Sequence, residues 1–429
     1  MSSLDVTIPD HIARAVVDPK AYADDTALYD ALRWLRANQP LGMTHIEGFA
    51  PFWLVTKHAD ILEISRQNDL FHSGDLPTTL TTKDADAKVR EMTGGSPHLV
   101  RSLVQMDAPD HPKFRVLTQA WFLPQNIRKL EDRIRTIARK HVDHMASLGG
   151  TCDFVADVAL HYPLRVIMEI LGLPPEDEPR MLRLTQELFG SQDPELNRGG
   201  EALEDSDATL AAIQAVLADF FMYFHQVTTA RRADPQDDVA TVIANGKIDG
   251  EPIGDFEAMS YYVIVATAGH DTTSSSTAGA IWGLCENPGE LAKLKADPSL
   301  IPGLVDEAIR WVTPVKHFMR SATQDYELRG RKIAKGDWMM LSYPSGNRDE
   351  EVFIEPDAFR VDRGASKHLA FGYGAHLCLG QHLAKMEMRI LFEEMLPRLK
   401  SVSFNGTPER AETNFVGGPK KLPIKFEMV

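Results

Sequence analysis

Ten residues near the C-terminus, Phe371 to Gly380, constrain the fold and the chemistry of this chain more than any other stretch. They hold three glycines, one histidine and Cys378. Apolar residues recur behind them at helical spacing until Pro397, so a helix is predicted to begin just after Cys378. The N–H groups and dipole at such an N-terminus favour a thiolate over a thiol, which makes Cys378 a candidate metal ligand or nucleophile. A lone cysteine is more often a small buried apolar residue, and that alternative stays open on Cys378 alone.

A second unusual stretch lies within the longest predicted helix, Gly254 to Asn287, which at about 1.5 Å per residue would span on the order of 50 Å. Ala268 to Thr273 reads Ala-Gly-His-Asp-Thr-Thr, and three serines and a threonine follow. The preceding residues from Tyr261 are almost wholly apolar, which indicates a helix buried on all sides. A polar run in its middle is therefore unexpected. The alternative is a solvated helix face, with hydroxyl groups that bond backbone carbonyls and bend the helix.

The pattern Phe-Gly-x-Gly-x-His-x-Cys-x-Gly resembles the haem-binding loop of the cytochrome P-450 superfamily of haem-thiolate monooxygenases, and every fixed position is filled here. The six residues from Ala268 are similar to the oxygen-activation motif of the same family. The resemblance covers the whole chain in order and points to soluble bacterial members. It implies a mainly α fold with a minor β part, a single domain over residues 1–429, and haem between the long central helix and the Cys-loop helix. The β-rich portion is expected at about residues 40–56, 313–345 and 401–429.

By this resemblance the cofactor is haem b, iron protoporphyrin IX, and the Cys378 sulfur is the axial ligand of its iron. Thiolate ligation pushes electron density towards the iron and favours O–O cleavage. Splitting dioxygen also takes two protons delivered inside a dry pocket, for which an alcohol and a carboxylate are suited. Thr272 matches the alcohol and Asp271 the acid of the family motif. His270 occupies a variable position and receives no role.

Haem carries two propionates, so the resemblance implies cationic partners for them. His111 and Arg115 lie one helical turn apart and point the same way. With Arg320 and His376 they match the propionate-binding positions of the family, and arginine suits carboxylates because it pairs with them bidentately. Each of these residues alone would more often be a surface charge.

Other family positions are structural. Glu307 and Arg310 lie three apart on one predicted helix, and Arg363 fits the position that completes a triad behind the haem loop. We expect all three to be scaffold. Phe371 and Gly380 are the fixed ends of the haem-binding loop.

The substrate is expected across the haem from Cys378, in a pocket suited to a small hydrophobic molecule. The resemblance implies a monoterpenoid or an alkyl-aromatic or aromatic hydrocarbon, hydroxylated with O2. By position, the pocket residues are expected to be Ile264, Thr267, Ala268, Phe318 and Val416. The Thr78–Val104 loop and a polar link, Gly190 to Asp207, would cover them. That link has few apolar anchors and two adjacent glycines, so it is predicted to be a mobile lid.

Electrons are expected to come from separate proteins, because the chain shows no flavin or nicotinamide fingerprint. The resemblance implies a [2Fe-2S] ferredoxin and an FAD-dependent ferredoxin reductase. Four cations would lie near the thiolate side and could attract an acidic ferredoxin: Lys113, Arg115, Lys367 and Lys385. Ordinary solvated lysines are the alternative for the three lysines.

Composition narrows the remaining choices. The net charge of −15 argues against a nucleic-acid partner, which would require a basic face. The chain has only three cysteines, Cys152, Cys285 and Cys378, and they lie far apart, so a reducing compartment is expected. The first residues do not resemble a signal peptide, and no run of about 18 uninterrupted apolar residues predicts a membrane anchor. The sequence therefore predicts a cytoplasmic protein.

The other segments predict a mainly helical chain. Helices are expected over residues 25–37, 57–66, 111–123, from Pro124 onward, 155–173, 176–189, 210–225 and 301–311, with strands near residues 43–46, 52–56, 326–333 and 338–342. Residues 73–102 are polar and threonine-rich, which predicts a long irregular loop.

Three rival functions remain at this point. A peroxide-driven haem enzyme of the same fold would not need the intact pair Asp271 and Thr272. A haem-based binding or sensor protein would not turn over a substrate. A zinc or thiol enzyme would use Cys378 with nearby histidines, but His368, His376 and His382 do not have the spacing of a zinc site.

Overall fold

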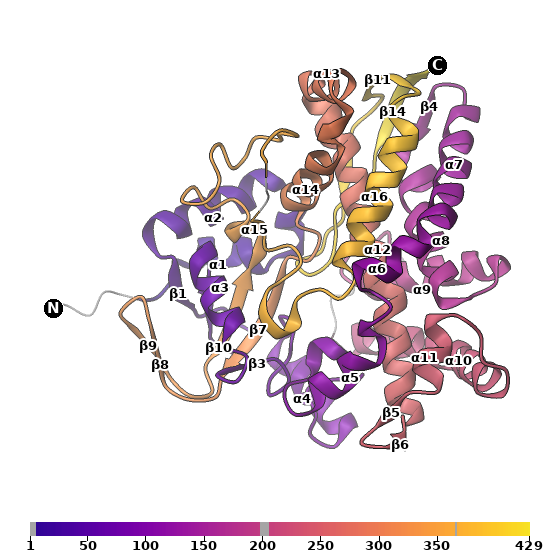
Figure 1. Cartoon of the computed structure of the whole chain (residues 1–429). Coiled ribbons are helices and arrows are strands. Elements are labelled where there is room, and N and C mark those ends of the chain that lie inside the picture. The colour runs from indigo at the N-terminus through magenta and orange to yellow at the C-terminus, as the bar shows by residue number, and fades with distance from the viewer. Residues whose placement is uncertain (1–5, 198–205, 365–366) are drawn as a thin grey trace.

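The computed structural model describes residues 6–197, 206–364 and 367–429, and it is mainly helical with a minor β part, as predicted (Figure 1). The helices of the first half are α1 (Asp10–Val17), α2 (Asp25–Asn38), α3 (His58–Arg66), α4 (Lys83–Thr93), α5 (Asp110–Gln119), α6 (Pro124–Ile127), α7 (Glu131–Ser147), α8 (His161–Leu171) and α9 (Glu178–Phe189). Those of the second half are α10 (Ser206–Ala233), α11 (Val239–Ala244), α12 (Asp255–Glu286), α13 (Pro288–Ala296), α14 (Ile301–Val312), α15 (Tyr343–Gly346) and α16 (Gln381–Met395).

The β part consists of two sheets and three short hairpins. The larger sheet has the order β1 (Leu41–Thr44), β2 (Phe52–Val55), β10 (Trp338–Ser342), β7 (His317–Ala322), β3 (Phe71–His72), and only its β2–β10 pair is parallel. The second sheet has the order β11 (Leu399–Phe404), β14 (Pro423–Met428), β4 (Thr151–Asp153). The hairpins pair β5 (Lys247–Ile248) with β6 (Glu251–Pro252), β8 (Tyr326–Leu328) with β9 (Arg331–Ile333), and β12 (Glu409–Arg410) with β13 (Pro419–Lys421).

Helix α12 runs through the middle of the helical part (Figure 1) and packs against α8, α10, α14 and α16. Its sequence allows this because glycines replace side chains where neighbours come closest. A Cβ atom at Gly279 would lie 2.0 Å from Cγ2 of Val312, and one at Gly283 would lie 2.7 Å from the ring of Phe359. Larger residues at these positions would push α14 and the Phe359 segment away from α12. The largest core cluster draws on residues from Leu103 to Phe426, which supports the single-domain prediction without testing it.

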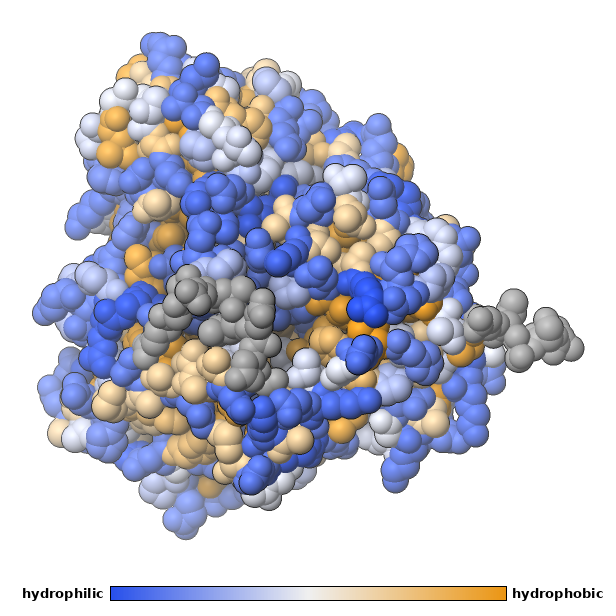
Figure 2. Space-filling view, turned by 180° about the vertical axis from the view of Figure 1, so that it is seen from behind, coloured by the Kyte–Doolittle hydropathy of each residue, from blue (hydrophilic) through white to orange (hydrophobic). Residues whose placement is uncertain are grey.

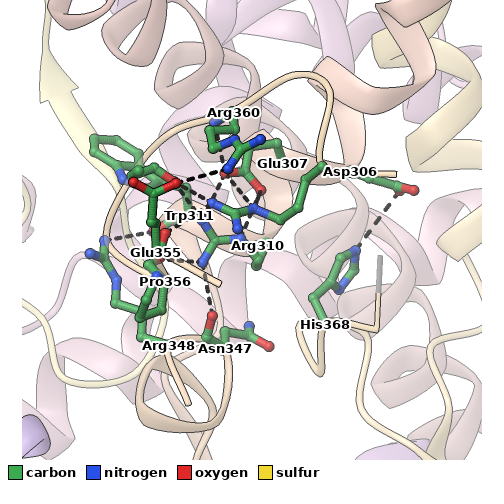
Figure 3. A network of polar contacts seen from close by, with 12 residues as sticks. Asp306, Glu307, Arg310, Trp311, Asn347, Arg348, Glu355, Pro356, Arg360 and His368 are labelled. Atoms are coloured by element: carbon green, nitrogen blue, oxygen red, sulfur yellow. Dashed lines mark hydrogen bonds and ion pairs between the residues drawn. The ribbon is translucent and has the colours of Figure 1, made fainter. Parts of the chain in front are cut away.

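The structural triad forms as predicted. Glu307 accepts hydrogen bonds from Arg310 at 2.7 and 2.8 Å and from Arg363 at 3.0 Å, and the side chains of Glu307 and Arg310 are 2% and 0% exposed. Figure 3 shows the Glu307 carboxylate facing the Arg310 guanidinium, with Asn347 and Pro356 beside them. Arg310 also donates to the carbonyls of Asn347 and Pro356. The triad therefore ties α14 to the segment that leads into the Cys378 loop.

Several predictions of elements were wrong in detail. The region 73–102 is not a plain loop, because it contains α4; Thr82 caps the helix by accepting from the Ala85 N–H, and Gly94 ends it in a left-handed conformation. The helix expected from Pro124 is broken between α6 and α7, and the one expected from Val155 begins as a π turn. Strands β3, β4 and β7 were not predicted individually; β3 and β4 are too short to show a pattern.

The predicted lid falls partly outside the described residues. The described part, from Gly190 to Asn197, has a polar anchor that the sequence analysis did not foresee. Asp193 is fully buried and accepts from Lys420 at 3.1 Å and from the Glu412 N–H at 2.9 Å. The base of this segment is therefore fastened to the C-terminal part of the chain.

Among the described residues, one helix is long and apolar enough to cross a membrane by length and composition, the stretch Asp207–Ala233 of α10. The sequence analysis expected none. A single helix of this kind carries little weight, because core helices pass the same test. The buried side of α10, including Phe220 and Phe224, packs against α9, α11 and α12. Apolar and hydrophilic residues are interspersed over the rear face of the molecule (Figure 2).

We predict that Glu307→Ala strongly destabilises the fold, because it leaves Arg310 buried without its carboxylate. Removing one partner of a buried ion pair costs about 3–5 kcal/mol. Urea unfolding followed by circular dichroism measures this change. The control is Lys332→Ala, which breaks an exposed pair with Asp325 and should leave the unfolding midpoint unchanged. A midpoint for Glu307→Ala equal to that of the control would contradict the scaffold role.

Candidate functional site

The Cys378 loop owes its shape to two glycines and one backbone bond. Gly372 and Gly374 have positive φ, and a Cβ atom at Gly374 would lie 1.9 Å from the Ser65 carbonyl oxygen of α3. The Cys378 N–H donates to the Phe371 carbonyl at 2.8 Å, which closes the loop. Helix α16 begins three residues after Cys378, as the sequence predicted. The loop therefore packs against α3, and it leads directly into the N-terminus of α16.

The Cys378 sulfur sits among opposing electrostatic influences. Burial raises the pKa of its thiol, while the N–H group of Gly380, the charge of Arg115 and the N–H group of Gln381 lower it. Burial is the largest of these effects, so the pKa lies above its ordinary value, although the N–H groups at the start of α16 favour the thiolate as expected. Cys378 is nevertheless exposed. An internal cavity beside the sulfur explains both the exposure and the raised pKa, because protein atoms surround the cavity and keep bulk water away.

Helix α12 also faces open space at its centre. Ala268 is exposed, although its neighbours Ala266, Thr267 and His270 are buried. Thr272, one turn further on, donates to the Ala268 carbonyl at 2.7 Å. A side chain exposed on a helix that the core otherwise surrounds indicates an internal cavity. The Cys378 loop and the middle of α12 thus each present an accessible residue within a largely buried structure.

One carboxylate oxygen of Asp271, the acid of the α12 motif, accepts no hydrogen bond. Oδ2 of Asp271 is buried and makes no hydrogen bond, and it lies 3.5 Å from Nδ1 of His270. His270 is fully buried, and its Nε2 lies 2.8 Å from the Leu160 carbonyl while its Nδ1 lies 2.7 Å from the Thr185 hydroxyl. A carbonyl only accepts, so Nε2 carries a hydrogen, and in a neutral ring Nδ1 then accepts from the Thr185 hydroxyl, which also lies 3.0 Å from the Leu182 carbonyl. His270 therefore fixes this turn of α12 to α9 and to the start of α8.

Four predicted cofactor-binding residues gather around one point. The rings of His111 and His376 are 4.4 Å apart, and the charges of Arg320 and Arg115 both act on His376. Arg115 donates to the Leu377 carbonyl at 2.7 Å, and Arg320 donates to the Met319 carbonyl at 2.7 Å. Burial lowers the pKa of all four groups. The cluster therefore joins α5, β7 and the Cys378 loop.

The two arginines of this cluster have no ion-pair partner among the described residues. In residues 6–197, 206–364 and 367–429, neither Arg115 nor Arg320 forms an ion pair, and Nε2 of His111 is buried without a hydrogen-bond partner. The carboxylate nearest to His376 is that of Asp107, at 4.0 Å, and it is engaged by the N–H groups of Ser73 and Gly74. Buried cations require compensation. Two carboxylates of a bound molecule would supply it, so these residues fit the propionates of a haem.

The expected pocket residues differ in what they expose. Ala268 is exposed, and Ile264 and Phe318 are half-buried; the Phe318 ring lies 5.7 Å from that of Phe415. Thr267 and Val416 are buried, so they offer little surface to a ligand. Their place in a substrate pocket stays a prediction.

The cations expected on the thiolate side are mostly engaged. Lys113 pairs with Asp249 at 2.5 Å, and Lys385 pairs with Asp306 at 2.7 Å and lies over the Phe371 ring. Figure 3 shows Asp306 beside His368 as well. Lys367 is exposed. Arg115 is half-buried and directed at the Cys378 loop, so it belongs to the cofactor cluster more than to the surface.

The sequence analysis missed Glu387 of α16. Glu387 is buried, burial raises its pKa well above the ordinary value, and it bonds to Thr273 of α12 beside Thr272. Its position between Met386 and Met388 was the available signal, although Lys385 and Arg389 on the same helix make that signal weak.

Comparisons with known proteins agree on one family. The family model described as Cytochrome P450 matches residues 80–426. Cytochrome P450-terp of a Pseudomonas species is 52% identical over 98% of this chain and 98% of its own. Linalool 8-monooxygenase of Pseudomonas putida is 31% identical over 92% of this chain and 95% of its own. The crystal structure of CYP108D1 from Novosphingobium aromaticivorans is similar with a TM-score of 0.90 and 46% identity, over 99% of this chain and all of that one.

We predict that Thr185→Val destabilises the protein by about 1–3 kcal/mol, because valine keeps the shape but leaves Nδ1 of His270 buried without a donor. Urea unfolding measures the loss. Thr136→Val is the matched control, since Thr136 is exposed on α7 and bonds only to the Asp132 carbonyl. Equal stability of the two variants would show that the Thr185–His270 bond does not hold α9 to α12.

Proposed function

The chain belongs to the cytochrome P450 family, and from this membership we propose that it is a haem-thiolate monooxygenase that inserts one oxygen atom of O2 into a small hydrophobic substrate. The observation that carries the proposal is the pairing of an exposed Cys378 with a cation cluster in which Arg115 and Arg320 have no ion-pair partner among the described residues. The family is one of oxidoreductases, and a named relative is a monooxygenase. The substrate, the electron donors and the individual residue roles below are proposals.

In this proposal the cofactor is haem b. The Cys378 thiolate would hold the iron, and the cluster of Arg115, Arg320, His111 and His376 would hold the propionates. Arg115 would contribute to both the propionate site and the iron site, because its charge also acts on the Cys378 sulfur and favours the thiolate. The N–H groups of Gly380 and Gln381 also reach the sulfur and stabilise its negative charge. When bound, haem supplies the activation of dioxygen that side chains cannot perform.

The proton donors are proposed to come from α12. The Thr272 hydroxyl rests on the Ala268 carbonyl at 2.7 Å and can turn from it towards the open space. The free oxygen of Asp271 can take a proton and pass it on, because no hydrogen bond holds it. His270 cannot rotate away, since both its ring nitrogens are bonded. His270 is thus fixed in place, whereas the side chains of Thr272 and Asp271 are available for proton transfer.

The proposed substrate is a monoterpenoid or an alkyl-aromatic or aromatic hydrocarbon. The terpene-related names of P450-terp and linalool 8-monooxygenase support this choice, and so does the half-buried aromatic pair Phe318 and Phe415. The proposed electron donors are a [2Fe-2S] ferredoxin and an FAD-dependent ferredoxin reductase. We place the protein in the cytoplasm, which suits its three free cysteines.

Two rivals share the fold: a peroxide-driven haem enzyme and a haem-binding sensor that does not turn over. The available carboxylate of Asp271 favours the oxygen-dependent reaction. Consumption of NADH that depends on both substrate and added ferredoxin and reductase would support the monooxygenase. Product formation from hydrogen peroxide alone would support the first rival, and a substrate-induced spectral shift without any product would support the second.

We predict that Cys378→Ala abolishes the thiolate-type spectrum of the reduced, carbon-monoxide-bound protein, because no other described residue of the cluster offers a sulfur. Absorbance spectroscopy after expression with ample iron and porphyrin precursor measures this. Cys152→Ala, at a half-buried cysteine in β4, should keep the spectrum. An unchanged spectrum in Cys378→Ala would refute the assignment of the ligand.

We predict that Thr272→Ala uncouples reductant use from product formation, because a positioned proton donor is worth on the order of 100-fold in rate. The ratio of product to NADH should fall and hydrogen peroxide should rise, while haem content stays constant. Thr272→Ser should restore most of the coupling. Ser274→Ala, a buried hydroxyl on the same helix, should couple normally; a coupling ratio for Thr272→Ala equal to that of Ser274→Ala would remove Thr272 from the relay.

A further inference from the structure

His317, at the start of β7, makes two hydrogen bonds to segments that are distant in the sequence. Its Nε2 accepts from the Leu80 N–H at 2.9 Å, and its Nδ1 lies 2.8 Å from the Asn414 carbonyl. A backbone N–H only donates and a carbonyl only accepts, so the ring is neutral and carries its hydrogen on Nδ1. The residue is 1% exposed. One imidazole therefore joins the segment before α4 to the C-terminal segment.

Asn414 extends the connection. Its side-chain oxygen accepts from Nε2 of Gln192 at 3.2 Å, its N–H donates to Oε1 of Gln192 at 3.0 Å, and its side-chain nitrogen donates to the Val17 carbonyl at 2.7 Å. Gln192 lies in the segment that follows α9. We call Leu80, Gln192, His317 and Asn414 the His317 junction. It joins four segments of chain through direct hydrogen bonds.

The junction lies directly behind an aromatic surface. The Phe415 ring is 5.7 Å from the rings of both His317 and Phe318 and 6.1 Å from that of Phe189. All three phenylalanines are only half-buried, so they retain surface for a ligand. They come from the end of α9, from β7 and from the C-terminal segment. Those are the segments, with the one before α4, that the junction fastens together.

We propose that His317 is a positioning residue for substrate binding, which holds the aromatic surface of Phe189, Phe318 and Phe415 in the arrangement that a small hydrophobic substrate requires. This inference rests on the proposed function, because it takes that surface to be part of the substrate pocket. The reason is geometric: three rings on three segments form one surface only while the segments stay in register. If the three segments are already held in register, substrate binding does not carry the entropic cost of ordering them.

Two further observations support this role. Burial lowers the pKa of His317 to about 4, so the neutral ring persists over the pH range in which enzymes of this kind are assayed. The residue next to Gln192 is also held in place: Asp193 accepts a hydrogen bond from Lys420 at 3.1 Å. The segment after α9 is thus held at two successive residues, and the Gln192 contact is the one that reaches the aromatic surface.

The test compares His317→Gln with His317→Leu. Glutamine can accept from the Leu80 N–H with its oxygen and donate to the Asn414 carbonyl with its nitrogen, whereas leucine fills similar space and does neither. Hydrogen–deuterium exchange of the peptides around Leu80 and around Asn414 reports on the junction without any substrate. Exchange there should rise on the order of tenfold in His317→Leu and remain near wild type in His317→Gln. His141→Leu, a half-buried histidine of α7 outside the junction, is the matched control.

Substrate binding is measured by the haem spin-state shift, with linalool and a panel of alkylbenzenes as probes. For the probe that wild type binds most tightly, Kd should rise about tenfold in His317→Leu and stay within about twofold in His317→Gln. Imidazole, which requires only the iron, should bind all variants alike. Gln192→Ala, at an exposed edge of the junction, should raise the probe Kd about threefold and serves if His317→Leu does not fold.

The outcomes separate this proposal from the proposed function. Protein that binds no haem would end the proposed function, and the exchange measurement would still decide whether the junction exists. Unchanged exchange and an unchanged probe Kd in His317→Leu would overturn the role of His317. A His317→Gln variant as impaired as His317→Leu, or a Gln192→Ala variant with wild-type Kd, would overturn it too, because the two hydrogen bonds would then not be the cause.

Discussion

This structure depends on two cations, the buried Arg320 and the half-buried Arg115, that form no ion pair with a carboxylate of the described chain. Burying a charge without compensation is costly, so the centre of the protein is electrostatically incomplete as a polypeptide. The surrounding scaffold holds this arrangement in place: Glu307 pairs with Arg310 and Arg363, and Gly279 and Gly283 bring α12 close to its neighbours.

The residues that the sequence singled out for the site lie near one another, and their roles stay predictions. Cys378, His376, His111, Arg115 and Arg320 come together as the family pattern implies, because short motifs with glycines at special backbone positions permit few conformations. The boundaries of α12 were also predictable, since Gly254 precedes its long apolar run and Asn287 follows it, directly before a proline. Helix α4 was missed because its composition is polar throughout, although Thr82 and Gly94 were readable as its caps.

Other features could not be predicted, because they depend on partners far away in the sequence. The thiol pKa of Cys378 follows from how many protein atoms surround it, which no local pattern records. The buried positions of Asp193 and Glu387, and the two bonds of His317, exist only once distant segments have packed. Polar residues of this kind are indistinguishable in the sequence from those on the surface. A single acid or histidine in an otherwise apolar segment is the most that a reader could note in advance.

The pairing of β4 with β14 has a consequence for how the protein is made. Strand β4 ends at Asp153, and its partner β14 begins at Pro423, so the smaller sheet cannot close until the 269 intervening residues and β14 have been synthesised. The parallel pair of β2 and β10 likewise cannot form until β10 has been synthesised. Nascent chains therefore spend most of translation with strand edges uncovered, and contacts between such distant residues form slowly. Ribosome-bound intermediates of this protein should therefore keep the edge of β4 unpaired until β14 has emerged.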